Sequence, residues 1–154
     1  MIKNIIAMLL LGMLLVTSCT QVPQDNGANQ NFQEKELYFE NIDKDPYGYI
    51  NYKSQRVIKT SEDFNEVWGQ TGSLKLLEEI DFSKDIVIAV FQGQKPTGGY
   101  SIEIYKIIER ENKIDVFIRE RSPGLNDIVT MALTSPYHVV KTQKSDKPVE
   151  FNIE

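Results

Sequence analysis

Cysteine and histidine each occur only once in this chain of 154 residues. One cysteine cannot form a disulfide within the chain, so a small disulfide-stapled fold is excluded. The same scarcity argues against a structural zinc site, which uses several Cys and His ligands. It also leaves a single histidine for any Ser-His-Asp or Cys-His catalytic device.

Basic charge is also in short supply. The formal net charge is −5, with 17 Lys and Arg against 22 Asp and Glu. A nucleic-acid-binding protein uses a basic face to displace counterions from phosphates, so we expect no nucleic-acid partner. The remaining composition, 41% hydrophobic and 25% charged residues, is typical of a chain that builds a packed core.

The longest apolar run stands at the N-terminus, over residues 5–16. It is too short to cross about 30 Å of hydrocarbon comfortably, but it suits the apolar centre of a signal peptide. The run leads into Thr17-Ser18-Cys19, which resembles the lipobox of bacterial lipoproteins. The resemblance implies a signal peptide at 1–18 and a lipid attached to Cys19. The alternatives are an ordinary secretory signal or an uncleaved anchor, with an incidental cysteine.

The segment after the signal is poor in apolar residues. Residues 19–35 are mostly Gln, Asn, Asp, Gly and Pro, and we predict a flexible tether there. Residues 36–154 are then predicted to form a single domain. The protein is therefore expected to be extracytoplasmic, in the bacterial cell envelope, and held on a membrane by its lipid anchor.

Most of the predicted domain has the two-residue period of β-strands. Ile86–Phe91 is an uninterrupted apolar run, which is typical of a strand covered on both faces, so we place it at the centre of a sheet. Residues 100–104 and 114–118 alternate apolar and polar side chains and are joined by a polar cluster, which predicts an antiparallel hairpin. Further strands are predicted at 49–59, 137–142 and 149–153, with a less regular one at 37–42.

One segment, near residues 61–70, has the helical period instead. Thr60 or Ser61 can cap its start, and apolar residues at i, i+3 and i+4 form one face. Gly69 or Gly72 would end it.

A second short helical turn is predicted around residues 74–80. Together these elements predict a mainly β, α+β fold: an antiparallel β sandwich or barrel-like sheet with one short helix.

Two blocks of sequence resemble a known family. Residues 92–104 read QGQKPTGGYSIEI and directly follow the predicted central strand, and residues 134–140 read TSPYHVV. These blocks are similar to the PrcB C-terminal domain family, over roughly residues 57–149. The family is named for a lipoprotein subunit of a bacterial surface protease complex. The resemblance implies a non-catalytic, protein-binding accessory or assembly subunit whose partner is a protease.

The first block supplies the candidate partner-binding loop. Its two glycines can leave the backbone open to a partner's main chain, with Lys95 and Thr97 as polar contacts on a rigidly held loop. The alternative is that the glycines serve only a sharp turn between two strands. The candidate residues are Lys95, Pro96, Thr97, Gly98, Gly99 and Tyr100, and the second block supplies a further candidate in Ser135, Pro136, Tyr137 and His138.

A second hypothesis concerns protease inhibition. Residues 96–100 also resemble part of the N-P-T-T-G-[YF] loop of chagasin-like cysteine protease inhibitors. Lys95 stands in place of the leading Asn, and no Arg-Pro-Trp loop is present. The inhibitor hypothesis would use residues 95–100.

Catalysis is not expected. The single histidine, His138, falls within a predicted strand, where a structurally bonded or surface role is the expected one. No metal site, cofactor or small-molecule substrate is predicted.

Overall fold

Eight strands and one helix form the part of the chain that the computed structural model describes, residues 32–76 and 79–154. The predicted signal peptide, Cys19 and the tether up to residue 31 lie outside these ranges. Within them, no helix combines the length and apolarity needed to cross a membrane. The elements are β1 (Lys35–Glu36), β2 (Phe39–Asp45), β3 (Ser54–Ile58), α1 (Ser61–Thr71), β4 (Asp85–Phe91), β5 (Ser101–Glu109), β6 (Ile114–Arg121), β7 (Tyr137–Gln143) and β8 (Val149–Ile153).

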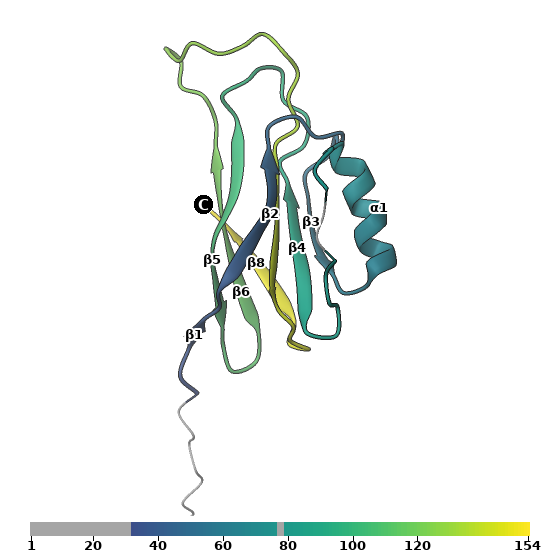
Figure 1. The fold of residues 1–154 in the computed structure, drawn as a ribbon. Coiled ribbons are helices and arrows are strands. Elements are labelled where there is room, and N and C mark those ends of the chain that lie inside the picture. The colour runs from purple at the N-terminus through teal and green to yellow at the C-terminus, as the bar shows by residue number, and fades with distance from the viewer. Residues whose placement is uncertain (1–31, 77–78) are drawn as a thin grey trace, which may run out of the picture. The chain divides into compact units, whose positions relative to one another are not determined.

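The strands form two four-stranded sheets. Figure 1 shows how they are arranged. Sheet A has the order β1-β5-β6-β8, and sheet B has the order β2-β7-β4-β3. The predicted β-rich α+β fold with one short helix is confirmed. One pair departs from the antiparallel expectation, since β8 runs parallel to β6. The chain reaches β8 from β7 of the other sheet and enters at the end where β6 begins, which fixes this direction.

Strand β4 is the centre of the packing. It pairs with β3 on one side and β7 on the other, and its residues 86–91 are all buried. Val87, Ala89 and Phe91 pack toward α1, whereas Ile88 and Val90 pack between the sheets. The predicted strand covered on both faces is thus confirmed. Each buried Val or Ile side chain contributes about 1.5–3 kcal/mol.

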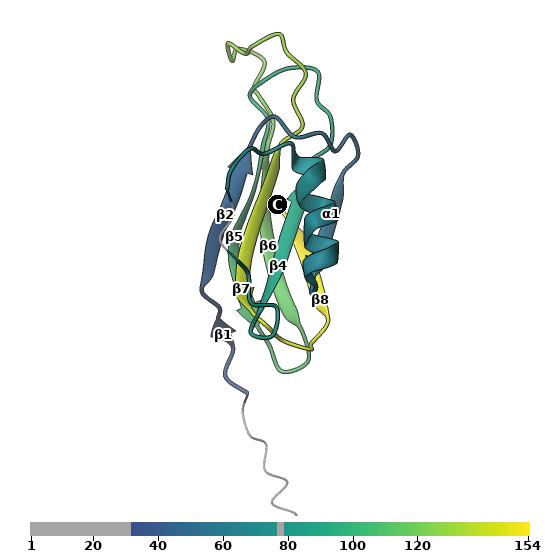
Figure 2. The same ribbon diagram turned by 45° about the vertical axis from the view of Figure 1, so that its right-hand side comes forward.

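Helix α1 covers the outer face of sheet B (Figure 2). Thr60 is its N-cap, and its Oγ1 accepts a hydrogen bond of 3.2 Å from the Asp63 N–H. Gly72, with φ 74°, ends the helix in the left-handed conformation. Of the predicted alternatives, Thr60 therefore caps the helix and Gly72 ends it. Phe64 is buried and carries the contact with sheet B.

Two predicted strands begin later in the chain than expected. The strand expected at 49–59 is confined to β3, because the Tyr49 N–H bonds to the Gln70 carbonyl and the Asn51 carbonyl accepts from Gln94. These contacts use a backbone N–H and a backbone carbonyl that would otherwise be available to pair with a neighbouring strand. The strand expected at 37–42 begins only at Phe39, as β2, because Leu37 is buried where the chain passes from β1 of one sheet to β2 of the other.

Two further boundaries differ from the prediction. Residues 74–76 and 79–80 are not helical, so the described part of the predicted 74–80 turn is irregular chain. Lys35, assigned to the tether, already pairs with Glu109 in sheet A. Just before it, Glu34 forms an ion pair with Arg110, which ties this part of the chain to the β5–β6 hairpin.

Candidate functional site

Three connections meet at one end of the sandwich, which we call the loop end and define as residues 46–53, 92–100 and 122–136. Strands β4 and β6 end there, whereas β5 and β7 begin there, so the connections emerge together (Figures 1 and 2). β1 lies toward the opposite end in the same views. The loop end contains every candidate binding residue of the sequence analysis except Tyr137 and His138, which begin β7.

The two sequence blocks of the family resemblance lie side by side at the loop end. The Lys95 N–H donates to the Thr134 carbonyl at 2.7 Å, and the Thr134 N–H donates back to the Lys95 carbonyl at 3.0 Å. The Thr134 Oγ1 donates to the Thr97 carbonyl at 2.8 Å. The Gln92 N–H donates to the Pro136 carbonyl at 2.9 Å. Residues far apart in the chain are thus joined through their backbones.

The two glycines of the candidate loop direct their Cβ side toward the chain itself, although Gly98 is partly exposed and Gly99 exposed. Gly99 has φ +84°, and a Cβ there would lie 2.8 Å from Val129 Cγ1 and 2.9 Å from Pro123 Cβ. A Cβ on Gly98 would lie 2.4 Å from Thr130 Oγ1. The Gly98 N–H donates to the Thr130 carbonyl. Residues 123–130 therefore fill the space on the Cβ side of both glycines, which is consistent with the architectural alternative, while Gly99 is exposed elsewhere.

The other candidates of this loop keep part of their surface open. Pro96 is exposed, and Lys95 and Thr97 are partly exposed. The Lys95 ammonium lies 5.6 Å from the centre of the Tyr100 ring, a cation–π contact at the rim of the loop end.

The connection between β6 and β7 carries the main feature that the sequence analysis missed. Leu125 and Ile128 are fully exposed, at 106% and 103%, and Met131 and Leu133 are exposed as well. Val129 and Pro123 of the same connection are the residues that approach Gly99. Val129 and Pro123 thus pack against the glycine turn at 98–99. The exposed Leu, Ile and Met side chains of the same connection point into solvent. The four large apolar residues within 125–133 were the signal in the sequence that could have indicated this feature.

The second candidate segment is buried. Ser135, Pro136, Tyr137 and His138 all lie in the interior at the start of β7. The Tyr137 hydroxyl donates to Asp43 Oδ2 at 2.8 Å. Burial, and next the hydrogen bond to Asp43, raise the pKa of Tyr137 well above its usual range. The segment supports the loop end from below and contributes little surface.

His138 links the two sheets. Its Nδ1 accepts a hydrogen bond of 2.9 Å from the Ile104 N–H on β5, where the β5–β6 register shifts. Since Nδ1 is an acceptor, the ring proton sits on Nε2, which lies 3.2 Å from Asn41 Oδ1. Burial, and secondarily the Lys44 charge, lower the pKa of His138 to about 4. Of the two roles expected from the sequence, structurally bonded or surface, the structure therefore shows the first.

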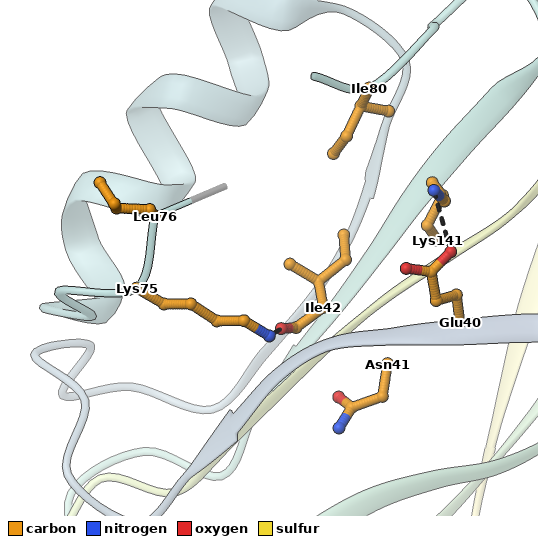
Figure 3. A pocket seen from close by; sticks show the side chains of 7 residues that line it. All are labelled: Glu40, Asn41, Ile42, Lys75, Leu76, Ile80 and Lys141. Atoms are coloured by element: carbon orange, nitrogen blue, oxygen red, sulfur yellow. Dashed lines mark hydrogen bonds and ion pairs between the residues drawn. The ribbon is translucent and has the colours of Figure 1, made fainter. Parts of the chain in front are cut away.

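A pocket beside β2 has a different character (Figure 3). Lys75 reaches from the segment after α1 and donates to the Ile42 carbonyl, where the β2–β7 register shifts. Glu40 and Lys141 form an ion pair of 3.0 Å. The charged side chains of the pocket thus lie beside the irregular part of β2, where Lys75 bonds to a backbone carbonyl and Lys141 to Glu40. In the described ranges, no group of three or more His, Cys, Asp and Glu side chains could hold a metal ion.

The fold defines a β-sandwich domain with three connections gathered at its loop end. Residues 86–143, from the start of β4 to the end of β7, match the protein family described as PrcB C-terminal. The match supports the resemblance to this family over these residues, which include both sequence blocks and the β6–β7 connection. No curated protein and no solved structure matches the chain.

The buried His138 predicts a pH dependence of stability. In the unfolded chain its pKa is near the ordinary 6.5, and in the folded protein it is about 4, so the unfolded state binds more protons between these values. The contribution of neutral His138 to the free energy of unfolding is fully present above pH 6.5 and decreases as the pH is lowered toward 4. The loss from this residue is about 3 kcal/mol.

Denaturant unfolding of the wild type and His138→Gln, at pH 7 and at pH 4, measures this contribution. The glutamine can still accept from the Ile104 N–H but does not titrate. Carboxylates contribute the same pH dependence to both proteins, so the wild type should lose more stability than the variant. Equal losses would contradict the assigned role.

Two glycine substitutions test the close packing of the turn. Gly99→Ala should destabilise the fold by more than about 1 kcal/mol, because of its positive φ and its contacts with Val129 and Pro123. Gly69→Ala is the matched control: it lies inside α1 with nothing within 4 Å of the new Cβ and should stabilise by about 0.5–1 kcal/mol. Denaturant unfolding compares them, and equal tolerance of both changes would refute the packing.

Proposed function

We propose that this protein is a lipid-anchored, extracytoplasmic accessory subunit that binds a protease through its loop end and has no catalytic role. The observation that carries the proposal is the set of exposed apolar side chains on the β6–β7 connection, within the segment that matches the PrcB C-terminal family. The family name supplies the connection with a protease complex, and the anchor follows from the lipobox resemblance at Cys19.

The exposed side chains favour a protein partner on physical grounds. Leu125, Ile128 and Met131 are held in water although each would gain about 1.5–3 kcal/mol on burial. Apolar residues grouped on a surface mark interaction sites, and long connections without secondary structure are frequently functional. Lys95 and Thr97 border this region and are proposed as its polar contacts.

The position of the loop end suits an anchored subunit. The chain enters the sandwich at β1, toward the end opposite the loop end (Figure 1). A lipid on Cys19 would attach to the domain through the residues that precede β1. The loop end would then be free to meet a partner.

The state of His138 supports binding rather than catalysis. A general base needs an accessible lone pair and a pKa near the working pH. His138 is 4% exposed, its Nδ1 lone pair is used by the Ile104 N–H, and its pKa is lowered to about 4.

Removing the apolar surface should abolish partner binding without unfolding the protein. We expect Leu125→Ser combined with Ile128→Ser to reduce co-purification of the protease at least tenfold. The melting temperature should stay within about 2 °C, since both side chains are exposed. Tyr38→Ser is the control, because Tyr38 is an exposed apolar residue between β1 and β2, outside the loop end.

Retention of the protease by the double variant, or equal loss in the Tyr38 control, would overturn the proposed surface. Stoichiometric inhibition of a purified cysteine protease would favour the inhibitor hypothesis instead.

The anchor has its own test. Metabolic labelling with a radioactive fatty acid should label the wild type, and Cys19→Ala should remove the label, because the sequence has no other thiol. Extraction of the mature wild-type protein from membranes without detergent would contradict lipid anchoring.

A further inference from the structure

Strand β8 lies at the edge of sheet A, where β6 is its neighbour. The Pro148 carbonyl accepts from the Ile114 N–H on the β6 side. The Glu154 N–H donates to the Ile118 carbonyl on the same side. Successive residues of a paired strand direct their backbone groups to alternate sides. The groups that point away from β6 therefore belong to Val149, Phe151 and Ile153.

This outer side of β8 is open to solvent. None of residues 149–153 is buried, and Ile153 is 42% exposed. Within residues 32–76 and 79–154, no backbone group of another segment bonds to Val149, Phe151 or Ile153 on the side away from β6. A row of free N–H and C=O groups is a template for pairing with another strand.

The other sheet edges are less suited to such pairing. β1 has only two residues. β2 has a register shift, and Lys75 donates to the Ile42 carbonyl there. β3 has Arg56 at its centre, so two copies of β3 would bring like charges together. Residues 149–153 contain no register shift, proline or lysine that would block pairing.

The sequence of β8 is complementary to itself. An antiparallel pair centred on Phe151 would place Val149 opposite Ile153 of the second copy. Outward residues would then face outward residues, so their N–H and C=O groups can all be hydrogen-bonded. On the other face, Glu150 would lie opposite Asn152 rather than opposite another carboxylate. Val149 and Phe151 already pack against the core between the sheets, so the apolar surface would continue from one copy to the next.

Other registers of the same pair are less favourable. A pair centred on Glu150 would set two carboxylates against each other and leave Ile153 unpaired. A pair centred on Asn152 would leave Val149 unpaired.

We propose that two copies of this protein pair along β8, antiparallel and centred on Phe151, so that their A sheets become one continuous sheet. Such a twofold dimer uses the same surface on both copies. The two domains run in opposite directions, so their loop ends point in opposite directions and stay available. This inference goes beyond the proposed function, because it requires neither a protease partner nor the apolar β6–β7 connection.

Cysteine crosslinking of two differently tagged full-length copies in the same cells tests the register. One copy carries Glu150→Cys and the other carries Asn152→Cys. Opposite residues at a position without hydrogen bonds have Cα atoms about 4.5 Å apart, which a disulfide can span. We expect the mixed 150–152 disulfide to form at least tenfold more than the 150–150 or 152–152 disulfide. The wild type, with Cys19 as its one cysteine, gives the background.

A proline variant separates pairing with a second copy from pairing with β6. Ile153→Pro removes an N–H that points away from β6, so the fold should persist, with a melting temperature within about 4 °C of that of Ile153→Ala. Ile153→Ala is the matched control, because it loses the same side chain but keeps the N–H. Sedimentation equilibrium of the full chain in density-matched detergent should show dimers of the wild type and Ile153→Ala. Ile153→Pro should raise the dimer dissociation constant at least tenfold above that of Ile153→Ala.

Equal yields of the three disulfides, a monomeric wild type, or an unchanged dimer of Ile153→Pro would each overturn the proposal. So would crosslinking of the Glu150→Cys copy to a different protein and not to the Asn152→Cys copy, because another strand would then be the occupant. If Ile153→Pro unfolds, the crosslinking pattern alone decides.

Discussion

The burial of β4 on both faces is the constraint on which the rest of the structure depends. A strand that is apolar on both faces must be covered by packed secondary structure on each side. Here sheet A covers one face of β4 and α1 covers the other. β7 is buried beside β4 and shares this requirement. β4 ends and β7 begins at the same end of the sandwich. The 92–100 and 122–136 connections are therefore brought together there.

The loop end is held by backbone contacts rather than by a separate core. Gly98 and Gly99 allow residues 123–130 to approach so closely that a Cβ would collide with them. The reciprocal bonds between Lys95 and Thr134 fix the other side of the same junction. A long connection that is anchored in this way can keep apolar side chains in solvent without collapsing onto the sandwich.

The sequence predicted those features that depend on local pattern. The apolar run at 86–91, the hairpin of β5 and β6, and the helix from Thr60 to Gly72 follow from side-chain period and capping. The parallel pairing of β8 depends on which sheet the chain has just left, and the contacts of Gly99 join residues distant in sequence, so neither has a local signal. The apolar side chains at 125–133 were visible in the sequence, but their exposure depends on the anchoring of the connection by the turn.

Site-specific photocrosslinking in intact cells tests the central claim most directly. A photoreactive phenylalanine analogue at Leu125 should give a crosslinked product that contains a protease, because this position is fully exposed at the proposed interface. The same analogue at Tyr38, exposed but outside the loop end, should not. A protease crosslink from Tyr38 and none from Leu125 would contradict the account.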